Sequence, residues 1–297
     1  MRNRFSPAKN ILASIFFLTA CSATPVENTG ASQLLAINII DNAAASAPSN
    51  ILKVASLNIA HGRGDSLNQL LVSSNTIQEN LDSIADFLQK HDVHVAALQE
   101  VDAPSSWSGK FDHAEHIATQ ANYRWWIQAS HASLGIADYG TAIVSSMPIT
   151  AAGQLDFTPS PPTAGKGFTV AEVQWQRPGV NAITVDVVSL HMDFSRKSVR
   201  ERQVEELDQT LKKRTNPLIL MGDFNSEVLA EELVNSGPEN KRRLHTWPAD
   251  SDPHYSYKKK RLDWIIISGE LEFVDYTTAK ETLSDHHAVV ASLRLRD

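Results

Sequence analysis

Residues 218–225 read Leu-Ile-Leu-Met-Gly-Asp-Phe-Asn, and this stretch joins a strand-like run to a polar cluster. Its first four residues form a short apolar run of the kind that makes a buried strand. Asp223 and Asn225 follow at alternate positions, so an acid and an amide can face the same side of a strand-to-loop exit. The acid can deprotonate a water, and the amide can donate to a phosphoryl oxygen. By itself Asp-Phe-Asn is equally consistent with a turn.

Further polar clusters lie in the same way at the ends of apolar, strand-like runs. They are Ser56-Leu57-Asn58, Gln99-Glu100, His191, Arg261-Leu262-Asp263 and Ser284-Asp285-His286. Polar residues in such positions collect at one edge of a sheet sandwich, where clefts form. Together the clusters supply carboxylates, amides and imidazoles, which suit a hard divalent cation, a phosphate and an activated water. The set predicts a metal-dependent phosphoesterase.

The residue chemistry assigns several roles before any family is considered. Glu100 can hold Mg²⁺ with few protein ligands and several waters, and Asn58 can add a neutral oxygen. A carboxylate such as Asp285 beside His286 can hold the ring and favour its cationic form, which suits charge on a pentacovalent phosphate. Asp263 can carry or relay a proton to the leaving group. For a lone histidine beside a strand, a purely structural role remains the alternative.

The clusters and their order resemble the endonuclease/exonuclease/phosphatase superfamily over roughly residues 51–297. This superfamily includes pancreatic-type deoxyribonuclease, abasic-site endonucleases, inositol polyphosphate 5-phosphatases and neutral sphingomyelinases. Each motif is weak alone, but all of them in the right order are a strong signal. The matching segments are Ser56-Leu57-Asn58, Leu98-Gln99-Glu100, Tyr139-Gly140-Thr141-Ala142-Ile143-Val144-Ser145, His191, Gly222 through Asn225, Leu262-Asp263-Trp264 and Ser284 through His286.

The resemblance implies an α/β fold, a four-layer sandwich of two packed mixed β-sheets flanked by helices. It also implies a bound Mg²⁺ or Mn²⁺ held by Glu100 with Asn58, and Asp285 is the third candidate metal ligand. No covalent enzyme intermediate is expected, because Cys21 lies far from these motifs and no activated serine is apparent.

By the same resemblance, Asp223 would activate the attacking water, and Asn225 would orient that water or the phosphate. His191 and His286 would bind and stabilise the phosphoryl oxygens. Tyr139 is a further candidate phosphate contact, although its spacing to the following glycine is shorter than in abasic-site enzymes.

The remaining acids complete this expected constellation. Asp285 would orient His286, and Asp263 would assist His191 or the leaving group. One histidine outside the family pattern, His61, is expected on the loop near the metal.

The first 21 residues predict a bacterial lipoprotein signal peptide. Three basic residues precede a short apolar run from Ile11 to Leu18, which is too short to span a bilayer as a stable helix. Leu18-Thr19-Ala20-Cys21 resembles the lipobox, in which the cysteine is lipidated. This places the mature protein in the cell envelope, lipid-anchored and extracytoplasmic. Ser22 lacks the acidic character of inner-membrane retention signals, which favours the outer membrane. An ordinary signal peptide is the alternative.

Residues 22–49 are rich in Ala, Ser, Asn, Thr and Pro and predict a flexible tether. Leu34 to Ile40 is the exception, since it can pack on the domain as a short strand or helix turn. Residues 50–297 show no repeat and no second linker, so we expect one catalytic domain and a monomer.

Strand-like and helix-like patterns alternate through this domain. Apolar spacing predicts helices over residues 75–90, 112–120, 199–213 and 227–235. Two turn-linked strand pairs are also expected. One joins residues 140–145 to 149–157 through Met147-Pro148, and the other joins residues 168–176 to 182–190.

The charge balance bears on the substrate. The formal charge is −7, and the first 21 residues carry three basic and no acidic side chains, so their removal leaves −10. This disfavours indifferent binding to long nucleic acid, which needs a basic stripe. Three basic groups remain, either as solvated surface or as contacts to an anionic substrate. They are Lys241-Arg242-Arg243, Lys258-Lys259-Lys260-Arg261, and Arg196 with Lys197, Arg200 and Arg202.

Three hypotheses therefore remain open. A tethered phosphoesterase acting on a lipid headgroup or small organic phosphate is slightly favoured over a tethered nuclease acting on DNA or RNA. A non-catalytic binding lipoprotein is the third, and it predicts the loss of a motif residue, whereas all are present. Four tryptophans near the variable loops can stack bases, touch a lipid interface or pack in the core; they are Trp107, Trp125, Trp126 and Trp247.

Overall fold

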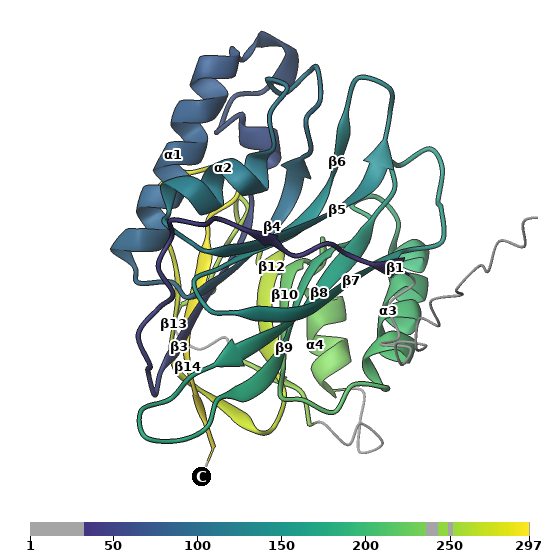
Figure 1. The fold of residues 1–297 in the computed structure, drawn as a ribbon. Helices are drawn as coiled ribbons and strands as arrows, with labels where there is room; N and C mark the ends of the chain where they lie inside the picture. The colour runs from purple at the N-terminus through teal and green to yellow at the C-terminus, as the bar shows by residue number, and fades with distance from the viewer. Residues whose placement is uncertain (1–32, 236–242, 249–251, 297) are drawn as a thin grey trace, which may run out of the picture.

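The computed structural model describes residues 33–235, 243–248 and 252–296. Cys21 and the predicted signal peptide lie outside these residues, as do Lys241 and Arg242. The described chain forms two seven-stranded sheets that pack face to face, with helices on their outer faces (Figure 1). No helix among the described residues is both long enough and apolar enough to cross a membrane.

The first sheet contains one parallel pair, β9 with β10, among its described strands. Its strand order is β1 (Gln33–Leu34), β7 (Ile149–Asp156), β8 (Gly167–Trp175), β9 (Ile183–His191), β10 (Leu218–Asp223), β12 (Asp263–Ile267) and β11 (His245–Thr246).

The second sheet has the same character, with β3 and β4 as its parallel pair. Its strand order is β13 (Leu271–Thr278), β14 (Val289–Leu295), β3 (Leu52–Asn58), β4 (Val95–Asp102), β6 (Asp138–Ser145), β5 (Trp125–Ser133) and β2 (Asn38–Ile39). Since parallel neighbours end at the same sheet edge, each pair delivers two polar side chains together.

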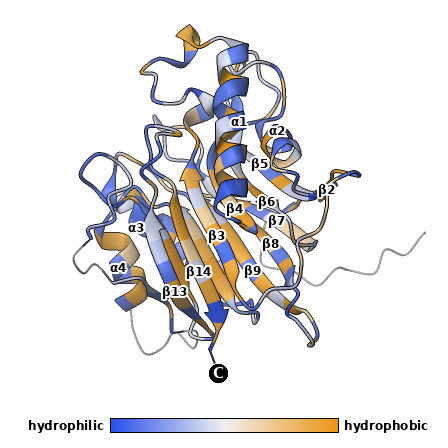
Figure 2. Cartoon of the chain, turned by 90° about the vertical axis from the view of Figure 1, so that its left-hand side faces the viewer, coloured by the Kyte–Doolittle hydropathy of each residue, from blue (hydrophilic) through white to orange (hydrophobic). Residues whose placement is uncertain are grey.

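Three hydrophobic cores separate the four layers. The outer cores lie beneath α1 (Ser74–Lys90) with α2 (His113–Gln120), and beneath α3 (Lys197–Leu211) with α4 (Val228–Asn235). The third lies between the sheets, and the central strands β3, β14 and β9 are hydrophobic along much of their length (Figure 2). The predicted four-layer sandwich is therefore confirmed.

The four predicted helices are all present, with boundaries shifted by one or two residues. In α1 the buried side chains recur at Ile77, Leu81, Ile84 and Leu88, which is the spacing of one helix face. The Ser73 hydroxyl caps this helix by accepting from the Thr76 backbone N–H. The cap thus gives one of the otherwise unpaired N–H groups of the first turn a side-chain acceptor.

One of the two expected strand pairs is wrong. Strands β8 and β9 pair as predicted, but β6 and β7 lie in different sheets. β6 pairs with β4 and β5, whereas β7 pairs with β1 and β8. The link through Met147, which is buried between the sheets, crosses from one sheet to the other rather than forming a hairpin.

The segment before residue 50 lies along the domain over its described part. β1 pairs with β7 of the first sheet, and β2 pairs with β5 of the second. The exception expected at residues 34–40 is therefore seen as two short edge strands. Ser49 adds a further attachment, because its carbonyl accepts from the indole N–H of Trp175 at 2.7 Å.

Candidate active site

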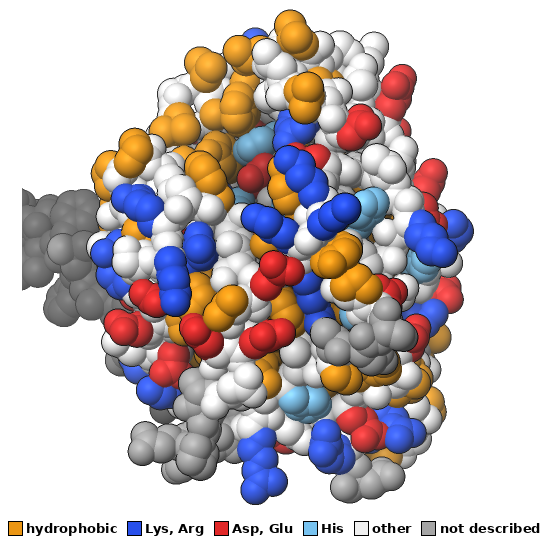
Figure 3. Space-filling model, turned by 180° about the vertical axis from the view of Figure 1, so that it is seen from behind, with side chains coloured by type: hydrophobic (Ala, Val, Ile, Leu, Met, Phe, Trp, Pro, Cys, Tyr) orange, Lys and Arg blue, Asp and Glu red, His pale blue; other side chains and the backbone are white. Residues whose placement is uncertain are grey.

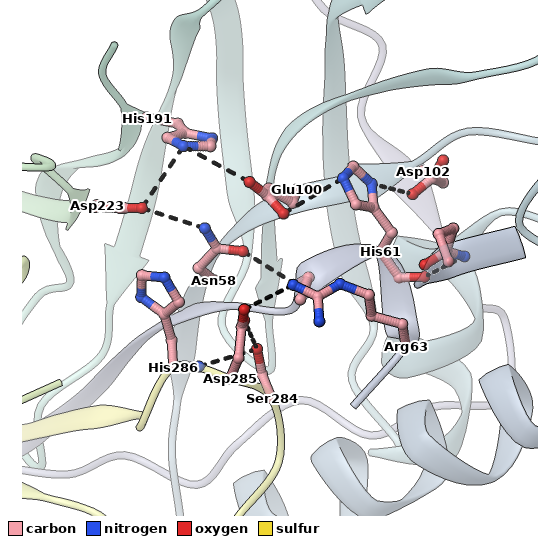
Figure 4. Close-up of polar contacts among 12 residues, drawn as sticks. Asn58, His61, Arg63, Glu100, Asp102, His191, Asp223, Ser284, Asp285 and His286 are labelled. Atoms are coloured by element: carbon pink, nitrogen blue, oxygen red, sulfur yellow. Dashed lines mark hydrogen bonds and ion pairs between the residues drawn. The ribbon is translucent and has the colours of Figure 1, made fainter. Parts of the chain in front are cut away.

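A polar pocket of about 340 Å³ opens where the carboxyl ends of both parallel strand pairs meet. Seven of the predicted site residues line it, together with Arg63, Phe194, Tyr257, Lys260 and Leu262. The seven are Asn58, Glu100, His191, Asp223, Asn225, Asp285 and His286. Figure 4 shows Asn58, Glu100, His191 and Asp223 pointing toward one another from different strands. Residues far apart in the sequence thus form one site.

Two backbone irregularities aim the side chains. Glu100 sits at a bulge in β4, with φ of 53°, where the register shifts between Gln99 and Val101. Such a bulge re-aims a side chain out of the regular strand alternation. Gly222 has φ of 150°, and a Cβ atom there would lie 2.0 Å from the carbonyl oxygen of Leu190. Glycine at this position therefore lets β10 approach β9 just before Asp223.

Asp223 is buried and held by two amides. Its Oδ2 accepts from Asn58 Nδ2 at 3.2 Å and from Asn225 Nδ2 at 3.3 Å, and its Oδ1 accepts from the Asn225 backbone N–H. Burial, together with the negative charge of Asp263, raises the pKa of Asp223 to about 7, although nearby His286 and these hydrogen bonds oppose the rise. A carboxylate with this pKa is suited to remove a proton near neutral pH.

The orientation of His286 differs from the expected one. Its Nδ1 donates to Asp263 Oδ2 at 2.8 Å, so Asp263, rather than Asp285, holds the ring. Burial alone would lower the pKa of His286, but the charge and hydrogen bond of Asp263 raise it to about 10. Asp285 instead accepts from Arg63 Nη2 at 2.6 Å and from the Ser284 hydroxyl (Figure 4). Asp285 directly precedes His286 in the sequence, so a pairing between these two residues was expected instead of the pairing with Arg63.

His191 is adjacent to a lysine that the sequence analysis missed. Lys166 Nζ is buried 2.9 Å from His191 Nε2 and 3.1 Å from Nδ1. Burial, followed by the charge of Lys166, lowers the pKa of His191 well below its usual value, so this imidazole is neutral. The sequence held one signal: Lys166 lies between two glycines directly before a strand that pairs with the strand of His191.

His61 lies beside Glu100, one of the candidate metal ligands. Its Nε2 is 3.3 Å from Glu100 Oε2, and its Nδ1 is 2.8 Å from Asp102 Oδ2. Trp107 also donates to Asp102, and its ring packs near that of His61. Tyr139 packs edge-on against His61, with ring centroids 4.6 Å apart, and does not line the pocket itself. Burial raises the pKa of Tyr139 to about 12, so its hydroxyl remains a donor.

The acidic side chains fit a divalent cation. Carboxylate oxygens of Asp223 and Asp263 lie within 4.8 Å of each other. Asp263 Oδ1 is buried with no hydrogen-bond partner among the described residues. Glu100 faces the same pocket, and carboxylate and amide oxygens are the donors that Mg²⁺ prefers. Of the predicted ligands, Glu100 and Asn58 meet in this pocket, whereas Asp285 is engaged by Arg63.

The pocket rim is basic and partly apolar. Lys260 and Arg63 both line it, and Tyr257 packs against His286 with ring centroids 4.7 Å apart. Phe194 also lines the pocket, although 65% of its surface is exposed. The positive charges of Lys260 and Arg63 can therefore attract an anionic group, and the exposed ring of Phe194 can contact a neighbouring apolar group.

A sequence model of the Endonuclease/Exonuclease/phosphatase family matches residues 55–286. This span includes every predicted catalytic and metal-binding residue. Among curated protein sequences, no match was found.

Solved structures share the fold at low sequence identity. An endonuclease/exonuclease/phosphatase from Bacteroides vulgatus superposes with a TM-score of 0.63 at 15% identity, covering 83% of this chain and 99% of that one. The human Nocturnin catalytic domain with bound sulfate has a TM-score of 0.61 at 16% identity, covering 88% and 98%. A mannosyl-6-phosphatase from Bacteroides thetaiotaomicron has a TM-score of 0.56 at 17% identity, covering 82% and 99%.

Proposed function

Because the chain belongs to the endonuclease/exonuclease/phosphatase family, we propose that it is a divalent-metal-dependent phosphoesterase acting on a lipid headgroup or small organic phosphate. One observation carries this proposal. Asp223, with its pKa raised to about 7, shares a pocket with His286, whose pKa is raised to about 10 by Asp263. A base and a cationic acid in one pocket are what hydrolysis at phosphorus needs.

Asp223 takes the proton from the attacking water. The amides of Asn58 and Asn225 fix its carboxylate, so the lone pair that receives the proton keeps one direction. In-line attack then requires the phosphoryl group to lie in the pocket with its leaving group on the side away from Asp223.

The cationic side chains neutralise the charge that builds up on the phosphoryl oxygens. His286, held by Asp263, presents its other ring nitrogen as a donor. Neutral His191 lines the β9 side of the pocket as a second donor, and the Lys166 ammonium lies buried against its ring. Preorganised donors of this kind stabilise a transition state more than a ground state because the charge is largest there.

Glu100 and Asn58 would hold Mg²⁺ or Mn²⁺, with Asp223 and Asp263 adding to the negative field that attracts it. Such an ion supplies Lewis-acid polarisation of a phosphoryl oxygen.

The substrate class is inferred from charge and location. The chain is acidic overall, which disfavours indifferent binding along nucleic acid. We further propose that Cys21 carries a lipid anchor, which would keep a monomeric catalytic domain at the envelope surface and close to phospholipid. The second candidate is a nuclease, favoured by the exposed basic run Lys258 to Lys260 at the pocket rim.

A substrate panel tests the proposal. The purified chain is assayed with Mg²⁺ or Mn²⁺ against plasmid DNA, RNA, sphingomyelin, phosphoinositides and bis-p-nitrophenyl phosphate. The Asp223→Asn variant should lose the activity, whereas Asp275→Asn, which changes an exposed acid on β13, should keep it. Equal activity in both variants contradicts the proposed base.

The same panel separates the candidates. Cleavage of lipid or small esters supports the favoured substrate class. Nucleic-acid cleavage that weakens steeply with salt supports the nuclease instead, since phosphate contacts release counterions. Metal binding without hydrolysis of any substrate would favour a binding lipoprotein.

A further inference from the structure

Three leucines in one short loop are exposed to solvent. Leu67 is fully exposed, and the exposed fractions of Leu70 and Leu71 are 69% and 82%. The last two lie on the short helical turn η2 (Gln69–Leu71). Large apolar side chains gathered outside the core mark a surface that meets a partner or a membrane.

Hydrogen bonds attach this loop to residues next to the active-site pocket. Gln69 is buried at its centre, and its side-chain amide reaches the carbonyls of His61 at 3.4 Å and Trp107 at 3.5 Å. His61 in turn contacts Glu100 in the pocket. The exposed leucines therefore sit on the outer side of residues that build the site.

The tip of the β5–β6 hairpin adds two more apolar side chains. Leu134 and Ile136 are 58% and 57% exposed. The Ile136 carbonyl accepts from the Trp107 backbone N–H, so the hairpin tip and the leucine loop are both attached to the loop of Trp107. We call Leu67, Leu70, Leu71, Leu134 and Ile136 the apolar rim.

Basic side chains accompany the apolar rim around the pocket. Lys110 lies on the loop of Trp107, and Lys258, Lys259 and Lys260 are exposed beside the pocket. Among the described residues, no carboxylate lies within ion-pair distance of these four lysines. In Figure 3, hydrophobic side chains gather over the upper end of this face, above Lys and Arg side chains that surround a hollow containing His and acidic groups.

We propose that the apolar rim docks into the surface of an anionic phospholipid layer and holds the pocket at headgroup depth. The inference rests on the proposed function and names its substrate as a phospholipid presented in a membrane. Apolar side chains beside exposed lysines are the combination that binds an anionic interface. A second copy of the chain is a poorer occupant, because it would bring the same lysines face to face.

A fluorophore attached at one residue of the full chain tests docking independently of a lipid at residue 21. Cys21 is the only cysteine, so a Cys21→Ser background with Leu70→Cys carries an environment-sensitive fluorophore at one site. The matched control is Val180→Cys, which is exposed in the β8–β9 turn at the opposite end of β9 from His191. Vesicles of mixed phosphatidylcholine and phosphatidylglycerol should shift the emission of the probe at residue 70 to the blue, and leave that at residue 180 unchanged.

A kinetic measurement accompanies the probe. The variant Leu67→Ser/Leu70→Ser/Leu71→Ser should hydrolyse vesicle phospholipid at least about tenfold more slowly, because docking by three apolar side chains is lost. Its rate on soluble bis-p-nitrophenyl phosphate should stay within about twofold of the wild type, since none of the three leucines lines the pocket. Val180→Ser should change neither rate.

The outcomes separate this inference from the proposed function. Hydrolysis of the soluble ester without a probe shift on vesicles overturns docking and leaves the phosphoesterase standing. A probe shift without hydrolysis of any ester overturns the phosphoesterase and keeps docking. Equal shifts at residues 70 and 180 mean that the protein adsorbs to vesicles without a preferred face. If the wild-type chain is a dimer in solution and the triple variant is a monomer, a second copy covers the apolar rim. Both of these results overturn docking.

Discussion

The imidazole of His286 donates from Nδ1 to Asp263 Oδ2 at 2.8 Å, within a few ångströms of the buried carboxylate of Asp223. This relationship gives the pocket two titrating groups of opposite role. Asp263 raises the pKa of His286 and also that of Asp223, because one negative charge favours a cation and disfavours a second anion.

Replacing Asp263 with asparagine should lower kcat by about 10²- to 10⁴-fold, because His286 loses the partner that keeps it cationic and oriented. Loss of the charge should also bring the pKa of His286 down toward its ordinary value of 6.5. Steady-state kinetics and an NMR titration of the imidazole would measure both effects. Asp285→Asn is the informative comparison: if it moves the pKa of His286 as far as Asp263→Asn does, the pairing is not the one described.

The pH profile of kcat/KM should be bell-shaped. Asp223 acts as a base only when deprotonated, so the rate should rise with pH through about 7. His286 acts as a cation only when protonated, so the rate should fall near about 10. Profiles on a soluble ester from acid to alkali would measure both limbs. In Asp263→Asn both limbs should move to lower pH, and an unmoved upper limb would exclude His286 as its origin.

Glu100→Gln should remove most of the stabilisation that Mg²⁺ gives the folded chain. A ligand at one hundred times its Kd adds about 2.7 kcal/mol to the free energy of unfolding, and a weakened site loses that increment. Thermal melts with and without Mg²⁺ would measure it independently of activity. Glu270→Gln, which changes an exposed acid in the turn before β13, should keep the full shift. Retention of the shift in Glu100→Gln would remove this residue from the metal site.

Asp193→Asn should destabilise the loop that carries Lys166. The Asp193 side chain is buried and accepts from the Thr163 hydroxyl at 2.6 Å and from the backbone N–H groups of Ser195 and Arg196. Loss of its charge should cost about 2 kcal/mol in the free energy of unfolding at neutral pH.

The pH dependence of that loss has a definite sign. Burial alone would raise the pKa of Asp193, but the hydrogen bonds from Thr163 and then from the Arg196 backbone hold it well below the usual 3.8. The stabilisation is therefore present above about pH 4 and is lost as the pH falls further. Urea unfolding at several pH values would measure it. Asp208→Asn, which breaks a pair with Lys212 on the surface of α3, should cost at most about 0.5 kcal/mol at any of them.

Local elements were predictable from the chain because their causes are local. The spacing of Ile77, Leu81, Ile84 and Leu88 predicts α1, and the pairing of β8 with β9 follows from two apolar runs around one turn. The link through Met147 has similar features, but it joins two different sheets. A run of apolar residues indicates that a strand is buried on both faces, but it does not indicate which neighbouring strand pairs with that strand.

The chemical inventory can be read from the chain alone: which acids, amides and imidazoles end the strands, and therefore the family and the kind of reaction to expect. How these side chains pair depends on the folded chain. Asp263 reaches His286 across 23 residues, Asn58 reaches Asp223 across 165, and buried Lys166 reaches His191. The physical reason is that a propensity acts within a few residues, whereas a pocket is made by contacts between strands whose order in the sheet is set by packing of the whole core.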